Sequence, residues 1–229
     1  MFEVLILPFN FIEPLDYVSE AVYTVILAVY VLLVIFATLP LYKFLVSRGV
    51  PENVARYYNR KLVHMFAGGV VAVLVPHVYT SPLFPLLASV LLALLLILAR
   101  RFRPMYWFQT QDNAYEVNFV IAWGLSVFVL WHIFLDPFVA VLPAIFISYG
   151  DAVTGIVRNA LFGHRTKHWA GNLAMAIVCI PVGLAYAGLW GFLAALAAVI
   201  VERFEFGPVD DNILIVLVST LILAYPHLV

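Results

Sequence analysis

The chain alternates long apolar stretches with short polar connections. A helix needs about 20 apolar residues to cross the hydrocarbon core of a membrane. The sixth and seventh stretches are short and separated only by residues 188–191, which favours a helical hairpin that does not fully cross. The pattern predicts an all-α, polytopic transmembrane bundle in a single domain, residues 1–229. Its eight expected helices lie near residues 18–46, 62–79, 82–99, 115–135, 138–160, 172–187, 188–203 and 212–226.

Composition supports the same class. The chain is 65% hydrophobic and only 11% charged, and 229 residues could not hide that much apolar surface inside a water-soluble globule. The net charge of −1 gives no reason to expect a nucleic-acid partner. Cys179 is the single cysteine, which excludes both a disulfide framework and a cysteine metal site. We expect an integral multi-pass protein, in the cell membrane of a prokaryote or the endoplasmic reticulum of a eukaryote.

The cations indicate orientation. All twelve Lys and Arg residues fall in four segments, at 43–61, 100–103, 158–167 and 203, and the alternate connections contain none. Asp136 lies in one of those connections, and acids crowd the N-terminus. Cations are retained on the cytoplasmic side of membranes. The pattern therefore predicts cytoplasmic loops near 47–60, 100–112 and 158–171, with both termini external.

The first polar cluster lies where the second predicted helix enters the membrane. Arg60 and His64 are four residues apart and share a helix face, with Lys61 beside them. Gly68 and Gly69 would let a neighbouring helix approach closely. Cations at this depth alone are typical of ordinary flanking residues, and a lone histidine is typical of packing. An ionisable residue within a span nevertheless indicates function by default, and the combination makes this a candidate site.

The second cluster is in the fifth predicted helix. Spacings of three, four and seven place Asp151, Thr154 and Arg158 on one stripe of the helix. Gly150 and Gly155 lack side chains and would leave room near this stripe for a ligand or a close helix. A carboxylate inside the membrane must be paired, bind a metal or face a water-filled cavity. One alternative is a purely structural pair between Asp151 and Arg158.

The third cluster is a basic loop. Arg165 and Lys167 lie near Gly163 and Gly171, and a helix is expected to begin at about Asn172. Free backbone N–H groups at a helix start favour phosphate, so these residues form a candidate anion site. The alternative is a basic loop that contacts anionic lipid headgroups.

The fourth cluster is acidic. Glu202, Asp210, Asp211 and Asn212 lie in a connection on the same predicted side as the basic loops. Hard oxygen ligands beside a phosphate-binding surface indicate Mg²⁺, which takes one or two carboxylates together with substrate phosphates. Asp210, Asp211 and Asn212 could instead cap the last helix.

Together the clusters predict one cytoplasm-facing site with cations for phosphates, carboxylates for a metal and an apolar interior. This inventory suits phosphoryl or nucleotidyl transfer onto a lipid, which depends on positioning and charge neutralisation. The chain has no GxxxxGK[ST] motif, which excludes a P-loop nucleotide site.

The ordered set of motifs resembles the family of dolichol kinase, phytol kinase and CTP-dependent diacylglycerol kinase, over roughly residues 60–220. The resemblance implies that the protein phosphorylates a membrane alcohol with CTP and Mg²⁺. It assigns Asp151 to the metal and to catalysis, Lys167 to the nucleotide phosphates, and Arg60, Lys61 and His64 to the nucleotide or transferred phosphate. The motifs are Arg60-Lys61 with His64 and Gly68, Gly150-Asp151-Ala152, Phe162-Gly163, Lys167 with Gly171, and Glu202 followed by Asp211-Asn212.

One segment departs from the family pattern. The family often has Lys, then Ser or Thr, any residue, Glu and Gly, whereas this chain has Lys167-His168-Trp169-Ala170-Gly171. Either the missing acid is supplied by Glu202 or Asp211, or the donor and the substrate differ.

Two other functions stay open at this point. A phosphatidate cytidylyltransferase also uses CTP, but its Lys-Asp and Gly-His-Gly-Gly signature is absent. A transporter could relay protons or ions through Asp151 and His64, although a pathway needs polar groups at every depth. The acceptor alcohol, whether dolichol, geranylgeraniol or diacylglycerol, is also open, since methylene-level differences are worth only about 1–3 kcal/mol.

Overall fold

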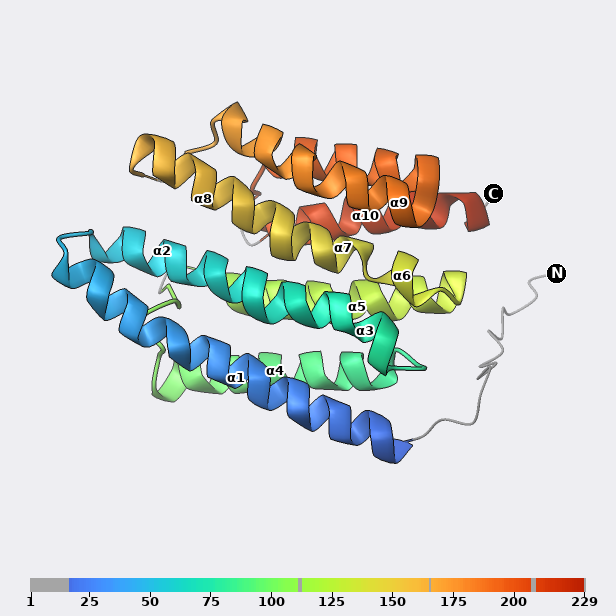
Figure 1. Ribbon diagram of the computed structural model, residues 1–229, viewed down its shortest axis with the longest axis horizontal. Coiled ribbons are helices and arrows are strands. Elements are labelled where there is room, and N and C mark those ends of the chain that lie inside the picture. The colour runs from blue at the N-terminus through green and yellow to red at the C-terminus, as the bar shows by residue number, and fades with distance from the viewer. Residues whose placement is uncertain (1–16, 111–112, 165, 207–208, 229) are drawn as a thin grey trace.

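The computed structural model describes residues 17–110, 113–164, 166–206 and 209–228. Within these residues the secondary structure is helical and contains no strand; an isolated antiparallel bridge joins Phe206 and Val209. Figure 1 shows long helices running side by side along one axis. The predicted all-α bundle is confirmed.

Six helices of the described residues are long and apolar enough to cross a membrane. This is the architecture expected of an integral, multi-pass membrane protein. A seventh apolar helix, α10 (Asp211–Leu228), is shorter. The six are α1 (Tyr17–Ser47), the rod α2–η1–α3 (Glu52–Val63, His64–Gly69, Val70–Val78), α4 (Leu83–Phe102), α5 (Tyr115–Phe134), the rod α6–α7–η2–α8 (Pro137–Ala140, Leu142–Ile145, Phe146–Gly150, Asp151–Phe162) and α9 (Trp169–Val201).

The second helix begins earlier than predicted, at Glu52 rather than near residue 62. Its first turns are polar on one side, so a search for continuous apolar sequence misses them. Their other side is buried: the Asn59 amide donates hydrogen bonds to the carbonyl oxygens of Thr38 at 2.7 Å and Trp107 at 3.1 Å. These contacts fix α2 against α1 and the α4–α5 connection.

The predicted sixth and seventh helices correspond to two halves of α9. Ala187 and Gly188 interrupt it with non-helical dihedral angles, and Gly188 has a positive φ of 53° that favours glycine. The chain folds back there, and the two halves approach so closely that a Cβ atom on Gly191 would collide with the carbonyl group of Gly183. The Asn172 amide in the first half also donates to Val199 O in the second half at 2.6 Å.

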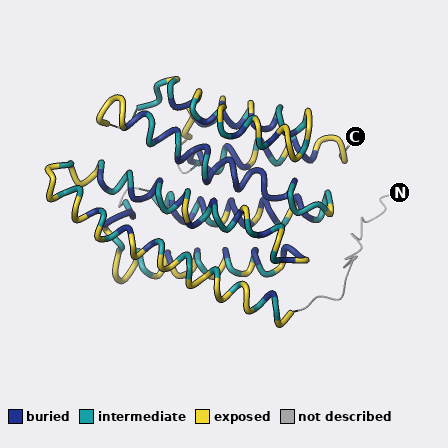
Figure 2. Tube along the Cα trace, in the orientation of Figure 1, coloured by how far each residue is buried: buried dark blue, intermediate teal, exposed yellow. Residues whose placement is uncertain are grey.

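Burial differs sharply between the rods, as Figure 2 shows. In the most apolar window of Pro137–Phe162, 83% of the residues are buried, against 11% in the window of α1. Apolar residues on α1 and α4 remain exposed, as expected of surfaces that contact lipid. The rod that contains Asp151 is therefore the centre of the bundle.

Candidate active site

Two π-helical segments position the site. η1 begins at His64, η2 ends at Gly150 immediately before Asp151, and the two segments pack against each other. Their close approach depends on glycine: a Cβ atom on Gly69 of η1 would lie 2.6 Å from the ring of Tyr149 in η2. Short π-helical turns inside α-helices occur often at functional sites. Here they bring His64 and Asp151 together across about 90 residues of sequence.

Asp151 is paired with Lys61. The Lys61 ammonium lies 2.6 Å from both carboxylate oxygens, and the two residues are only 4% and 1% exposed. The structural pair with Arg158 considered above is therefore wrong. His64 Nδ1 lies 3.6 Å from Asp151 Oδ2, too far for a hydrogen bond, and its ring stacks on Phe119 at 3.9 Å. Neither ring nitrogen has a hydrogen-bond partner among the described residues.

Arg158 forms a buried network with the two ends of α9. Its guanidinium contacts both carboxylate oxygens of Glu202, at 2.7 and 2.8 Å, in the bidentate geometry that makes such pairs strong. It also donates to His168 O and to Asn172 Oδ1, each at 2.8 Å. The Asn172 amide reaches Glu202 Oε2 at 3.2 Å. Arg158, Asn172 and Glu202 thus form one connected polar group.

Lys167 joins that network to the last helix. Its ammonium lies 2.7 Å from the carbonyl oxygen of Glu202, 3.0 Å from Asp211 Oδ2 and 3.2 Å from Glu205 Oε1. Burial acts to lower the pKa of Lys167, but the carboxylates of Asp211 and Glu202 outweigh burial and raise it above its usual range. The side chain is 30% exposed, so it borders the buried site and the surface.

Three carboxylates converge from separate helix ends. Asp151, Glu202 and Asp211 each offer an oxygen, and these atoms lie within 4.8 Å of one another. Clustered hard oxygen ligands are of the kind that binds Mg²⁺, and these three residues are the ones at which a metal is expected from the sequence. Each carboxylate also contacts a cation, in the pairs Asp151–Lys61, Glu202–Arg158 and Asp211–Lys167.

A polar cavity of about 190 Å³ is lined by sequence neighbours of two of these paired residues, Arg60 next to Lys61 and Asn159 next to Arg158. Arg60 lines it, with its guanidinium carbon 4.4 Å from the centre of the Tyr115 ring and 5.4 Å from that of Tyr57. Asn159 also lines it, is 4% exposed, and has no partner for either amide atom within the described chain. Sequence reasoning missed Asn159, Tyr57 and Tyr115, because no sequence motif distinguishes them and only their position around the cavity at Arg60 makes them candidates.

The basic loop differs from the sequence expectation. α9 begins at Trp169, about a turn before the predicted start at Asn172, and His168 caps it by accepting a hydrogen bond from Ala170 N. Asn172 therefore lies inside the first turn, where its side chain serves the Arg158 network. Gly171 packs so closely that a Cβ atom would collide with Arg158 Nε. Arg165, the remaining predicted phosphate ligand, lies outside the described residues.

The residues of the acidic segment make different contacts. Asp210 caps α10, since its Oδ1 accepts a hydrogen bond from Ile213 N at 3.1 Å, and burial raises its pKa to about 6. The capping interpretation is confirmed for Asp210, whereas the Asp211 carboxylate contacts the Lys167 ammonium. Asn212 is buried, and its Oδ1 has no partner in the described chain. Thr154 donates to Gly150 O at 2.8 Å, which ties the predicted stripe to the end of η2.

No protein-family model, curated protein or solved structure matches the chain.

Proposed function

We propose that the protein is a membrane kinase of the dolichol kinase type, which transfers the γ-phosphoryl group of CTP to the hydroxyl of a lipid alcohol at the cytoplasmic face. The observation that carries this proposal is the buried convergence of three carboxylates within 4.8 Å, each in contact with a cation from Lys61, Arg158 or Lys167. Phosphoryl transfer requires little beyond positioning and charge neutralisation. Ionisable groups at this density are costly in a membrane protein unless they act on a ligand.

Asp151, Glu202 and Asp211 would hold the Mg²⁺ ion, which supplies charge neutralisation for the phosphates. The cations that now contact these carboxylates are suited to phosphate oxygens as well, because ammonium and guanidinium groups donate charge-assisted hydrogen bonds to both. Lys167 has the exposure needed to meet a nucleotide that arrives from water. Metal and nucleotide would thus replace an existing set of ion pairs.

In the proposed reaction, the hydroxyl oxygen of the lipid alcohol attacks the γ-phosphorus of CTP. The new oxygen–phosphorus bond forms as the bond from the γ-phosphorus to the β–γ bridging oxygen breaks. CDP leaves, the lipid monophosphate remains in the membrane, and His64 accepts the hydroxyl proton. His64 suits this role because neither ring nitrogen has a partner among the residues that the structure describes, and Nδ1 lies 3.6 Å from Asp151.

The polar cavity supports a nucleotide as the donor. An unpartnered, buried amide offers one donor group and one acceptor atom, which suits the edge of a nucleotide base. Arg60 and the rings of Tyr57 and Tyr115 surround the same space, where a base could stack. We assign the base to the cavity at Asn159 and the phosphates to the cluster at Asp151.

We also propose that the chain crosses the membrane eight times, with both termini on the external side. The two halves of α9 are the sixth and seventh passes and α10 is the eighth; its 18 residues extend about 27 Å, close to the ~30 Å hydrocarbon core. Cysteines introduced at Arg56 and at His132 should react with impermeant reagents from opposite sides of the membrane. Labelling from the same side would contradict this topology.

Product analysis tests the reaction. The purified protein in lipid nanodiscs is incubated with CTP, Mg²⁺ and a panel of lipid alcohols, and both nucleotide and lipid products are identified. CDP with a lipid monophosphate supports the kinase. Pyrophosphate with a CDP-lipid would support a cytidylyltransferase. If neither pair of products forms, the result would favour a transporter.

A further inference from the structure

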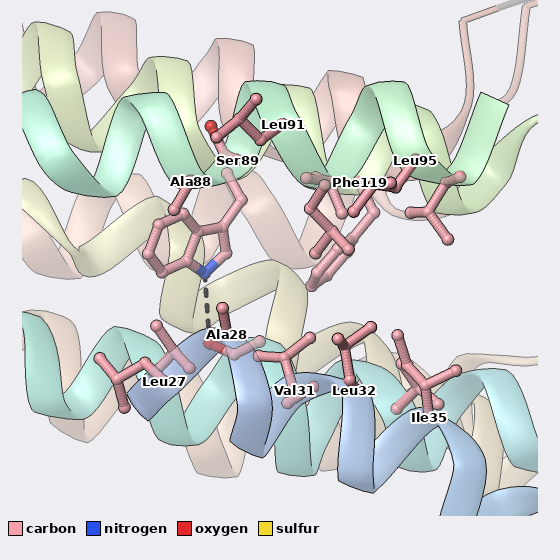
Figure 3. Close-up of a pocket in the computed structure, with 18 of the residues that line it drawn as sticks. Leu27, Ala28, Val31, Leu32, Ile35, Ala88, Ser89, Leu91, Leu95 and Phe119 are labelled. Carbon is pink, nitrogen blue, oxygen red and sulfur yellow. Dashed lines mark hydrogen bonds between the residues drawn. The ribbon is translucent and has the colours of Figure 1, made fainter. Parts of the chain in front are cut away.

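An apolar cavity of about 360 Å³ lies within the bundle, between α1 and α4, with the α2–η1–α3 rod and α5 behind. In the close-up of Figure 3, Leu27 and Val31 of α1 face Ala88 and Ser89 of α4 across the space. Most lining side chains are aliphatic or aromatic. Such walls favour a hydrocarbon ligand.

The cavity opens towards the lipid. Val25 and Leu32 on α1, and Leu91 and Leu95 on α4, line it and are also exposed on the outer surface of the bundle. Along α1 the lining extends from Thr24 to Ile35, a distance of about 16 Å at 1.5 Å per residue. That is roughly half of the ~30 Å hydrocarbon core, which matches one leaflet. A lipid chain could therefore enter sideways and lie along the helix.

One end of the cavity is polar. His64 lines it, and its two ring nitrogens have no partner in the described part of the chain. Glu116 lines it as well, and although Glu116 Oε1 pairs with Arg100 at 2.9 Å, the buried Oε2 has no partner within the described residues. Glu116 precedes Phe119 by three residues on α5, so both lie on one helix face, and Phe119 stacks on His64. Buried polar atoms are nearly always satisfied, and a ligand group explains these exceptions.

We propose that this cavity binds a lipid alcohol with a single hydrocarbon chain, with the chain along α1 and the hydroxyl at His64 and Glu116. The inference rests on the kinase proposed above and narrows its acceptor to single-chain alcohols. The volume lies near the lower end of the ~300–1,000 Å³ of pockets that hold one small molecule, so the enclosed space suits one hydrocarbon chain rather than two. His64 then links the lipid hydroxyl to Asp151, 3.6 Å away.

Photo-crosslinking without nucleotide tests binding directly. A geranylgeraniol analogue with a diazirine on its chain is irradiated with the unmodified protein in nanodiscs, and the labelled peptides are mapped. We expect labels within residues 24–35 and 85–96, removed by excess geranylgeraniol but not by excess diacylglycerol. Labels outside both segments, or equal competition by diacylglycerol, would overturn the inference. This experiment needs no variant and therefore does not depend on how substitutions affect folding.

Cavity-filling variants provide the matched test. Ala28→Phe with Ala88→Phe places two rings in the cavity, whereas Ala37→Phe places one on the lipid-facing surface of α1. The double variant should lose labelling by about tenfold or more, since a filled pocket cannot repack around a chain. The control should label like the original protein. Undiminished labelling of a folded double variant would refute the assignment.

The two proposals fail separately. Labelling that maps to the cavity, together with no phosphate transfer from CTP, would retain the lipid site and reject the kinase. CTP-dependent phosphorylation that is unaffected by the double variant would retain the kinase and reject this cavity as the acceptor site.

Discussion

Two buried carboxylate sites, one at the start of α1 and one around Asp151, differ in how they are satisfied. Glu20, near the start of α1, is 2% exposed and accepts hydrogen bonds from three neutral donors. These are Thr80 N at 2.7 Å, Thr80 Oγ1 at 2.6 Å and Ser81 Oγ at 3.3 Å, all in the α3–α4 connection. Both of its oxygens have partners, so this carboxylate ties two segments together.

The site at Asp151 is built differently. Each of its three carboxylates contacts a cation, and polar atoms around them on His64, Asn159 and Asn212 have no partner among the described residues. Leaving a buried polar atom unsatisfied costs about 1–3 kcal/mol, so a structural role alone does not account for several in one place. The comparison teaches that burial of charge does not distinguish structure from function, whereas unsatisfied neighbours do.

The largest expected effect is the loss of turnover on substitution of Asp151. Because Lys61 would become an unpaired buried cation, we pair Asp151→Asn with Lys61→Met, which removes both charges. This double variant should remain folded and lose at least about 10³-fold in lipid phosphorylation, as expected when a principal electrostatic group is removed. Near-normal turnover would make Asp151 structural, like Glu20. Glu20→Gln serves as the control and should retain full activity.

The next effect concerns stability. Arg158→Met leaves Glu202 buried without its bidentate partner and should lower the free energy of unfolding by about 3–5 kcal/mol. Arg158→Met with Glu202→Met should recover much of this loss, because both charges are removed together. Denaturant titration in detergent measures both variants. If the single variant is as stable as the original protein, the network around Asn172 does not hold the ends of α9.

Substitution of Glu20 should lower the stability of the protein without lowering its activity. Glu20→Ala removes the acceptor of three hydrogen bonds and should lower the free energy of unfolding by about 1–3 kcal/mol. Turnover per folded molecule should stay unchanged, since the residue lies at the start of α1 rather than at the site around Asp151. Parallel measurement of unfolding and lipid phosphorylation decides this. A selective fall in turnover would argue for a polar pathway through the whole membrane and hence for a transporter.

The smallest effect is expected at Asn159. Asn159→Ala removes a buried amide that makes no side-chain hydrogen bond in the described chain, so the free energy of unfolding should not fall. The KM for CTP should rise about tenfold, equivalent to about 1.4 kcal/mol, while the KM for the lipid alcohol stays constant. An unchanged KM for CTP would remove the base from this cavity.

The sequence by itself determined the class of the protein and most helix positions. Apolar stretches of spanning length identify membrane helices because hydropathy is local, and the interruption at residues 188–191 was visible from glycine spacing. Charge within or at the edge of predicted spans also identifies Asp151 and Lys61 as candidate site residues from the sequence alone. The helix start at Glu52 was missed, because its first turns are amphipathic rather than apolar.

Only the tertiary structure decided which charges meet and which polar atoms stay unsatisfied. Lys61 rather than Arg158 faces Asp151, since the rotation and depth of each helix are set by packing against its neighbours. The same packing leaves Asn159 and Glu116 at cavities, although neither stands out in the sequence. Hydropathy therefore establishes where a helix lies in a membrane, while its partners depend on contacts between segments up to about 90 residues apart.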